Sequence, residues 1–150
     1  MLKLNKLTNK EVRSISRKLK ERYSCEFENN YAFFVNKDGK IYIVNKRFLK
    51  AKIKNKLNSI GIYFCKYEKD GLRLSIEGSM LMKNPKANVI KLNKSQFETW
   101  MKGNDLELKY EKGYVLLEYD NMIIGCGKSN SENILNFVPK ARRMQNSKDF

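Results

Sequence analysis

The sequence predicts an α+β fold, in which a small N-terminal α/β module (residues 1–58) precedes a small mixed β-barrel with short helices (residues 59–150). Three observations predict this arrangement. Apolar residues recur at helical spacing from position 12, an Asp-Gly pair separates two strand-like runs within 31–44, and at least five short strand-like runs with two short helical segments follow position 60. Of the 150 residues, 41% are apolar, which is enough for one packed domain or two very small ones.

The first helix of the N-terminal module is expected to begin after Thr8. Thr8 and Glu11 have the spacing of a capping box, in which each side chain accepts a hydrogen bond from the other residue's backbone N–H. The apolar residues that follow share one helix face and are expected in the core: Val12, Ile15, Leu19 and Tyr23. A separate stripe carries Lys10, Arg13, Arg17 and Lys20. This stripe is either a solvated face or a phosphate contact through Arg13 and Arg17, since arginine can direct two donors at phosphate oxygens.

A hairpin and a second helix complete the module. The runs 31–35 and 40–44 read as strands, and Asp38-Gly39 between them is a strong hairpin signal. Their aromatic side chains are expected in the core rather than stacked on bases. After Asn45 as N-cap, residues 46–57 read as a basic amphipathic helix that includes Arg47 and Lys50. A membrane surface or nucleic-acid phosphate could each supply the counter-charge, and the modest aromatic and leucine content favours phosphate.

The second module is predicted to be mostly strands. The strand-like runs are Gly61–Cys65, Gly71–Leu74, Asn88–Leu92, Tyr114–Glu118 and Met122–Gly125. Ser75 and Asn93 are the expected N-caps of two short helices that end near Met82 and Lys102.

The boundary between the two modules is predicted from the distribution of charge along the chain. Residues 1–58 hold 16 basic and 5 acidic residues (net +11), whereas residues 59–150 hold 15 and 11 (net +4).

The net charge of +15 predicts an anionic partner. Lysine richness alone could reflect an AT-rich genome or growth at high temperature, but neither requires such an excess of basic over acidic residues. A charge of this size repels itself and destabilises the compact state unless a partner neutralises it. We therefore expect nucleic acid as the partner, with an anionic membrane surface as the second choice.

The residues that common catalytic sites need are scarce. The chain has no histidine, and Cys25, Cys65 and Cys126 are far apart, so neither a zinc site nor a Cys-His or Ser-His nucleophile is expected. Gly127-Lys128-Ser129 resembles the end of a phosphate-binding P-loop, but Met122 stands where that motif needs its first glycine. We expect no catalytic residue, no metal and no cofactor, and we expect the three cysteines to act as small buried apolar side chains.

The sequence also bears on location. No apolar run approaches the ~20 residues that a membrane helix needs, and the first residues lack the pattern of a signal peptide. We expect a monomeric, cytoplasmic protein that does not bind membranes.

Several spaced elements within residues 61–144 match a known pattern. They are Gly61-Ile-Tyr-Phe-Cys65, Gly71-Leu-Arg-Leu-Ser75, Trp100-Met-Lys-Gly103, Gly113-Tyr-Val-Leu-Leu117, Gly125-Cys-Gly-Lys128, Leu135-Asn-Phe-Val-Pro-Lys140 and Arg142-Arg143. The region resembles the PUA-like RNA-binding domain at the C-terminus of the fmu/sun (RsmF-type) rRNA cytosine-C5 methyltransferases. Leu74 departs from the pattern, because the family usually has proline there. Neither Pro85 nor Pro139 precedes a cysteine, so the family's catalytic Pro-Cys motif is absent. The chain is therefore similar to a free-standing, archaeal-type member of the family.

The resemblance implies RNA contacts for Lys128, Lys140, Arg142 and Arg143, with Arg73 as a lesser candidate. Gly125 and Gly127 would let the backbone approach the ligand closely. The alternative for these two glycines is that they only permit a bulge in the barrel.

These observations predict a non-catalytic RNA-binding protein of rRNA or tRNA modification or ribosome biogenesis, which works with an rRNA methyltransferase or a pre-ribosomal particle. A protein–protein adaptor in ribosome assembly is the alternative, and a methyltransferase subunit is the least favoured. Replacing Arg142 and Arg143 by Glu would separate the first two. The RNA-binding interpretation predicts lost RNA affinity with the fold intact, whereas the adaptor interpretation predicts lost capture of a protein partner.

Overall fold

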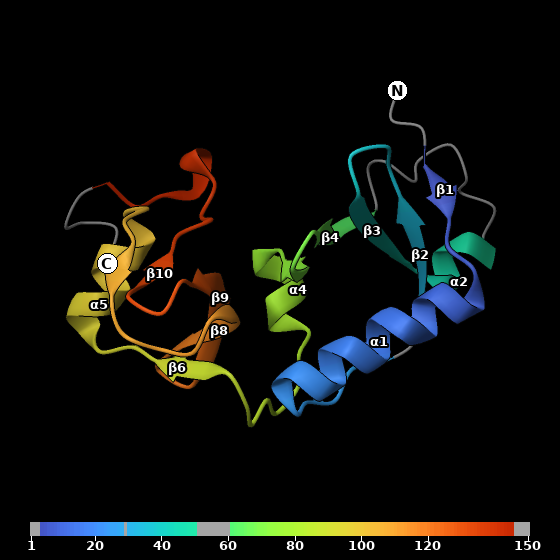
Figure 1. The fold of residues 1–150 in the computed structure, drawn as a ribbon. Helices are drawn as coiled ribbons and strands as arrows, with labels where there is room; N and C mark the ends of the chain where they lie inside the picture. The colour runs from blue at the N-terminus through green and yellow to red at the C-terminus, as the bar shows by residue number, and fades with distance from the viewer. Residues whose placement is uncertain (1–3, 29, 51–60, 146–150) are drawn as a thin grey trace.

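A computed structural model of the protein describes residues 4–28, 30–50 and 61–145, and it contains two five-stranded sheets with helices packed on them. Figure 1 shows the helix α1 (Asn9–Tyr23) running along the N-terminal sheet, and α4 (Ile76–Met80) between the two sheets. The helix α5 (Lys94–Met101) lies with the C-terminal sheet at the other end of the molecule. This arrangement confirms the predicted α+β class.

The first sheet is antiparallel throughout, in the order β1-β2-β3-β4-β5. Its strands are β1 (Asn5–Lys6), β2 (Tyr31–Val35), β3 (Lys40–Asn45), β4 (Ile62–Glu68) and β5 (Gly71–Leu74). The predicted hairpin is confirmed, since β2 pairs with β3 around a turn in which Gly39 has a φ of +83°. The Asn36 side chain stabilises this turn by accepting hydrogen bonds from the backbone of Asp38 and Lys40 at 2.9 and 3.0 Å.

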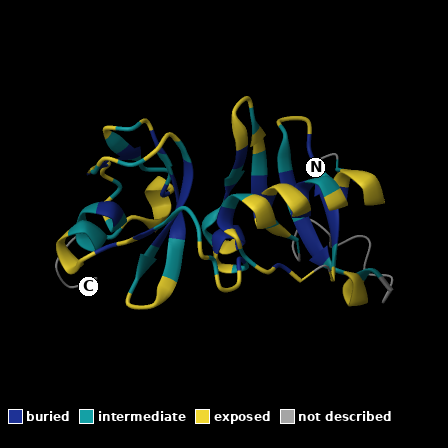
Figure 2. Ribbon diagram, turned by 60° about the horizontal axis from the view of Figure 1, so that its bottom comes forward, coloured by how far each residue is buried: buried dark blue, intermediate teal, exposed yellow. Residues whose placement is uncertain are grey.

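The helix α1 covers the inner face of this sheet. The predicted capping box is present, with Thr8 N donating to Glu11 at 3.0 Å and Glu11 N donating to the Thr8 hydroxyl at 3.2 Å. The four residues predicted for the core face are all buried: Val12, Ile15, Leu19 and Tyr23. They pack against Phe33, Ile41 and other inward-facing residues of β2, β3 and β4. Figure 2 shows the result, with buried residues in the strands and exposed residues on the outer side of α1.

The boundary predicted after residue 58 does not separate the two sheets. β4 and β5, which the sequence analysis placed in the second module, belong to the first sheet, where β4 pairs with β3. The net charge per residue does change at residue 58, but charged side chains lie at the surface and do not determine which strands pair. Strand pairing depends on which apolar faces can share a core, and Phe64, Cys65 and Leu72 share the core of α1.

Two short helices each follow a strand of the first sheet, the first after β3 and the second after β5. α2 (Lys46–Lys50) begins after Asn45, whose side chain accepts a hydrogen bond from the backbone of Arg47 at 2.9 Å. The remainder of the predicted helix, residues 51–57, and the side chain of Lys50 lie outside the described part of the structure. α4 begins after Ser75 as predicted, because the Ser75 hydroxyl accepts a hydrogen bond from Gly78 N at 2.9 Å.

The second sheet curls into a half-barrel, in the order β6-β8-β9-β10-β7. Its strands are β6 (Val89–Lys91), β7 (Leu106–Glu107), β8 (Gly113–Tyr119), β9 (Met122–Ser129) and β10 (Asn133–Leu135). β6 and β8 are parallel, and the other pairs are antiparallel. α5 has the predicted capping box between Asn93 and Gln96, and it buries Trp100 against Val115, Leu117 and Ile134. A short 3-10 helix, η2 (Lys140–Arg142), follows the sheet.

The two sheets share a core. Tyr114 and Leu116 of β8 and Cys126 of β9 pack in the same apolar cluster as α1 and the first sheet. Cys65 and Cys126 are buried as predicted, whereas Cys25 is half-buried. The core continues from one sheet to the other, so the surface where the sheets meet has a fixed geometry.

Candidate nucleic-acid interface

The outer face of the first sheet, opposite α1, carries aromatic and basic side chains. We call it the basic aromatic face, and it consists of Lys40, Tyr42, Tyr63, Lys66 and Arg73. The strand register brings these residues together, since Lys40 is paired with Lys66, Lys66 with Arg73, and Tyr42 with Tyr63. All five are half-buried, which leaves their outer surfaces open to a ligand. An irregularity in the β3–β4 pairing directs both Phe64 and Cys65 into the core and keeps Tyr63 and Lys66 on the outer side.

The rings and cations of this face contact one another. The ring centroids of Tyr42 and Tyr63 are 5.7 Å apart, and Lys40 Nζ lies 5.4 Å from the Tyr63 centroid. Lys66 and Arg73 each lie 3.8 Å from Glu68, so this carboxylate is shared between two cations. Burial raises the pKa of the Tyr63 hydroxyl, and this keeps the ring neutral. A neutral ring beside an excess of positive charge is the composition of surfaces that stack bases and hold phosphates.

A cleft of about 270 Å³ opens beside the basic aromatic face, between α4 and the segment that precedes and includes η2. It shares Lys40, Tyr63 and Arg73 with that face. Its other lining residues are Leu74, Ser75, Ile76, Glu77, Trp100, Gly125, Cys126, Phe137, Val138, Pro139 and Arg142. The cleft therefore has one wall from each half of the molecule.

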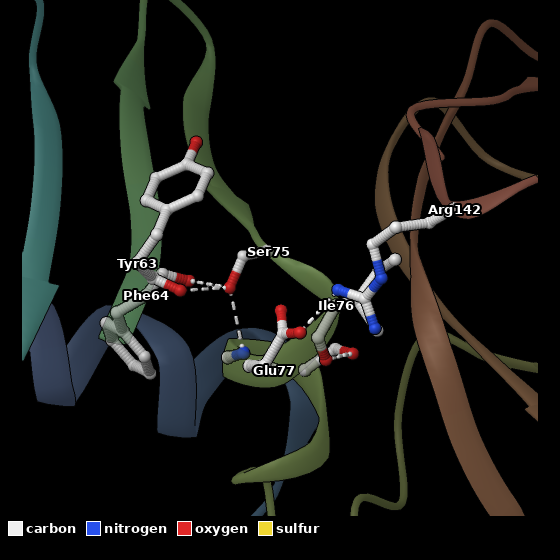
Figure 3. A network of polar contacts seen from close by, with 8 residues as sticks. Tyr63, Phe64, Ser75, Ile76, Glu77 and Arg142 are labelled. Atoms are coloured by element: carbon white, nitrogen blue, oxygen red, sulfur yellow. Dashed lines mark hydrogen bonds and ion pairs between the residues drawn. The ribbon is translucent and has the colours of Figure 1, made fainter. Parts of the chain in front are cut away.

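Polar contacts hold these walls in place. The Ser75 hydroxyl donates to the carbonyl oxygens of Tyr63 and Phe64, at 2.5 and 3.0 Å, and so fixes the start of α4 on β4. Figure 3 shows Arg142 reaching across from the opposite wall to form an ion pair with Glu77 of α4. A second contact also joins the two walls, since the Arg73 guanidinium of β5 lies 4.6 Å from the ring centroid of Phe137. Cation–π contact of this kind orients the guanidinium and leaves its edge donors available.

Trp100 lies on the floor of the cleft and is fully buried. Its Nε1–H is the one buried side-chain polar group with no hydrogen-bond partner among the residues that the structure describes. An unmatched buried donor costs about 1–3 kcal/mol, and buried indole N–H groups usually have a partner.

The two glycines of the Gly125-Cys-Gly-Lys128 block have different surroundings. A Cβ atom on Gly127 would lie 2.7 Å from Ile134 and 2.8 Å from Trp100, so packing requires glycine there. A Cβ atom on Gly125 would lie 3.7 Å from Trp100 Nε1 and 4.0 Å from Ile76, which are ordinary contacts. A methyl group on Gly125 would therefore contact the indole N–H without overlap.

The cations predicted from the resemblance divide into several environments. Arg73 and Arg142 line the cleft, and Lys140 is exposed on η2 beside it. Lys128 forms an ion pair with Asp70 and lies 5.6 Å from the Tyr114 ring centroid. Arg143 is exposed but donates through Nε to the carbonyl oxygen of Val138 at 3.1 Å, so it also has a structural contact.

The cations predicted in the N-terminal module do not join the cleft. Arg13 and Arg17 lie on the solvent side of α1, which covers the opposite face of the first sheet. With Lys20 they line a shallow groove on α1. Arg47 is exposed on α2. The structure therefore places the predicted basic residues on at least two faces of the molecule.

Sequence reasoning missed Lys40, Tyr42, Tyr63, Lys66 and Phe137. The alternation of polar and apolar residues in β3, where Lys40 and Tyr42 alternate with Ile41 and Ile43, was the available signal for an outward-facing pair. The expectation that strand aromatics lie in the core is confirmed for Phe33 and Phe34, which are buried. Tyr42 and Tyr63 are half-buried instead, although Tyr42 pairs with Phe34, which is buried in a small cluster with Leu49 of α2.

Two further findings concern metal sites and membrane-spanning helices in the part of the chain that the structure describes. No group of three histidine, cysteine, aspartate or glutamate side chains in residues 4–28, 30–50 and 61–145 is placed to hold a metal ion. No helix in that part of the chain has the length and apolar character that a bilayer crossing requires.

The family model of the methyltransferase RsmF PUA domain matches residues 87–144. This region is a PUA-like domain of the RsmF type. The PUA-like domain includes every strand of the second sheet, together with α5 and η2. β4, β5 and α4 precede the match, so the cleft lies between the PUA-like domain and the first sheet. No curated protein matches the chain.

Proposed function

We propose that this chain is a non-catalytic RNA-binding protein that acts in rRNA or tRNA modification or in ribosome biogenesis, and that it holds RNA on the basic aromatic face and in the adjoining cleft. One observation carries the proposal. The PUA-like domain contributes Arg142 and Phe137 to a cleft whose other wall contributes Lys40, Tyr63 and Arg73. Cations beside aromatic rings suit a strand whose phosphates need charge and whose bases need stacking partners.

The charge and composition of the chain support the same function. The net charge is +15, and three cations but one carboxylate, that of Glu77, are among the residues that line the cleft, with Glu68 outside it close to Arg73. The chain lacks histidine, the commonest general acid or base, which supports a binding role rather than a catalytic one. An rRNA methyltransferase acting in trans is the partner that the resemblance to RsmF-type enzymes suggests.

A titration with structured RNA at several salt concentrations tests RNA binding. If the protein neutralises about six phosphates, the plot of log affinity against log salt concentration has a slope of about −5 for duplex-like RNA. Absence of binding at low salt, or an affinity that does not depend on salt, would contradict the proposal.

Two matched double variants test the location of the site. Lys40→Gln with Arg142→Gln removes two charges from the cleft, and Arg13→Gln with Arg17→Gln removes two from the outer side of α1. We expect the first variant to lose about tenfold in affinity and to reduce the steepness of the salt slope by roughly 2, because each phosphate contact contributes about 1. We expect the second variant to bind nearly as the unmodified protein does. Equal losses would show that only total charge matters, and no loss in either would favour the adaptor function.

A further inference from the structure

The buried indole N–H of Trp100, beside Gly125, is a hydrogen-bond donor in the lining of the cleft that the residues of the described ranges leave without an acceptor. Trp100 is fully buried, and Nε1 has no acceptor among the described residues. A Cβ atom on Gly125 would lie 3.7 Å from Nε1 and 4.0 Å from the Ile76 side chain, so Gly125 and Ile76 are the neighbours of the indole N–H on the cleft side. Nε1 has almost no exposed surface, so an acceptor atom in the cleft reaches the indole N–H only when the lining at Gly125 and Ile76 moves apart to admit it.

Neither a packing clash nor a positive φ requires glycine at position 125. Gly125 is not among the glycines with positive φ, and a Cβ there would make ordinary contacts. Gly127 provides the contrast within the same strand, because its Cβ would overlap Ile134 and Trp100. Gly125 pairs with Leu117 next to an irregularity in the β8–β9 pairing, and its lack of a side chain leaves only backbone at position 125 beside Trp100 Nε1.

The surroundings of this position restrict the ligand. The Tyr63 and Phe137 rings line the cleft, and Lys40, Arg73 and Arg142 supply positive charge. The volume of about 270 Å³ is just below the ~300 Å³ at which pockets for small-molecule ligands begin, so it suits one compact group. A planar group that carries acceptor atoms and is attached to an anionic backbone fits all of these features.

We propose that the cleft takes a single unpaired nucleotide of RNA, whose base accepts a hydrogen bond from Trp100 Nε1–H while Lys40, Arg73 and Arg142 hold the flanking phosphates. This inference rests on the proposed RNA-binding function and specifies its substrate. A base within a duplex cannot enter, because it is stacked and paired, whereas a bulged or terminal base can leave the helix at small cost. The basic aromatic face would then carry the nucleotides next to the inserted one.

Trp100 is the only tryptophan, so its fluorescence reports on this position directly. The experiment titrates the protein with an RNA hairpin that carries one bulged nucleotide, made with each of the four bases, and with the same hairpin without the bulge. We expect at least one bulged RNA to bind about tenfold more tightly than the paired hairpin and to change Trp100 fluorescence, since a stacked base contributes of this order. The paired hairpin should bind without changing the fluorescence.

Gly125→Ala is the decisive variant, because the added methyl group fills the space beside Nε1 without overlap. We expect it to keep the thermal transition of the unmodified protein, to bind the paired hairpin equally well, and to lose both the preference for the bulged RNA and the fluorescence change. Retention of both properties in Gly125→Ala would overturn the inference. Equal binding of bulged and paired RNA by the unmodified protein, with unchanged fluorescence, would also overturn it and leave RNA binding intact. Failure of every RNA to bind would instead refute the proposed function.

Discussion

Gly78 lies where α4 crosses β4, and a Cβ atom at this position would overlap the carbonyl oxygen of Phe64. The same backbone carbonyl accepts hydrogen bonds from the Ser75 hydroxyl and from Ser75 N. The close approach thus fixes the start of α4, and with it Glu77 and Ile76 in the wall of the cleft. Glycine at position 78 is required by distance rather than by backbone conformation, since its φ is not positive.

We predict that Gly78→Ala destabilises the protein by about 1–3 kcal/mol, because the backbone of α4 must move away from β4 to admit the methyl group. Urea unfolding followed by circular dichroism measures the change. Gly125→Ala is the matched control, since its added methyl group makes only ordinary contacts. An equal effect of both substitutions would show that strand or helix propensity, and not the approach to Phe64, determines the cost.

Two glycines of the same strand, Gly125 and Gly127, have different surroundings although the sequence analysis predicted the same role for both. Gly125 and Gly127 were both predicted to let the backbone approach a ligand, with a purely structural role as the alternative. Packing against Ile134 and Trp100 supports the structural role for Gly127, whereas a Cβ atom on Gly125 would make only ordinary contacts. Burial of the cysteines was predictable from their chemistry. It raises the pKa of Cys126 to about 11, so this thiol stays protonated near neutral pH.

At the scale of elements, α1 is the one that local sequence specified best. Its start is set by the capping box, and hydrogen bonds from the backbone and hydroxyl of Thr8 lower the pKa of Glu11. Its buried stripe follows directly from the 3.6-residue period. Neither feature depends on the rest of the chain.

We predict that Thr8→Ala costs about 1 kcal/mol of stability, because the Glu11 backbone N–H loses its acceptor at the end of the helix. Thermal or urea unfolding at neutral pH measures this cost. Thr8→Ser keeps the hydroxyl and should restore most of the stability. If the serine variant is as unstable as the alanine variant, the methyl group of Thr8 and not its hydroxyl is responsible.

β4 is the element that the sequence assigned to the wrong sheet. Its apolar run was recognised, but its partner was not, because an alternating run can pair with any strand that presents a matching face. The partner is β3, and the pairing places Tyr63 beside Tyr42. The basic aromatic face exists only because of this pairing, so it could not be read from either strand alone.

At the scale of the whole molecule, side chains tie the two sheets together next to their shared core. Asp70, in the turn between β4 and β5, accepts a hydrogen bond from the Tyr114 hydroxyl at 2.9 Å and forms an ion pair with Lys128. Arg22 at the end of α1 donates to the carbonyl oxygen of Tyr114 at 3.0 and 2.7 Å. These contacts join α1 and the first sheet to β8 and β9, and they hold the two walls of the cleft at a constant separation.

We predict that Asp70→Asn lowers the melting temperature at neutral pH and that the difference from the unmodified protein disappears in acid. Lys128 and then the Tyr114 hydroxyl hold the pKa of Asp70 below its ordinary value of 3.8. A carboxylate whose pKa is lowered by folding stabilises the native state above that ordinary value, and the stabilisation is lost as the pH falls through the lowered native value. Melting curves of both proteins between neutral and strongly acidic pH measure this loss.

Asp38→Asn is the control, because it removes the same charge from the exposed β2–β3 turn, away from the contacts between the sheets. A similar pH-dependent difference in the Asp38 variant would show that net charge, rather than the tie between the sheets, is responsible.

The sequence by itself determined the local features of this protein: the caps of α1, α4 and α5, the Asp-Gly hairpin, the buried stripe of α1, and the PUA-like character of the C-terminal region. Each depends on residues that are close together in the chain or on a motif of fixed spacing. The tertiary structure decided which basic residues share a surface. Arg73 and Arg142 meet at the cleft with Lys40 and Tyr63, while Arg13 and Arg17 lie on the far side of α1. The physical reason is that charge is carried by side chains on every face, and only strand pairing and the shared core fix which of those faces lie side by side.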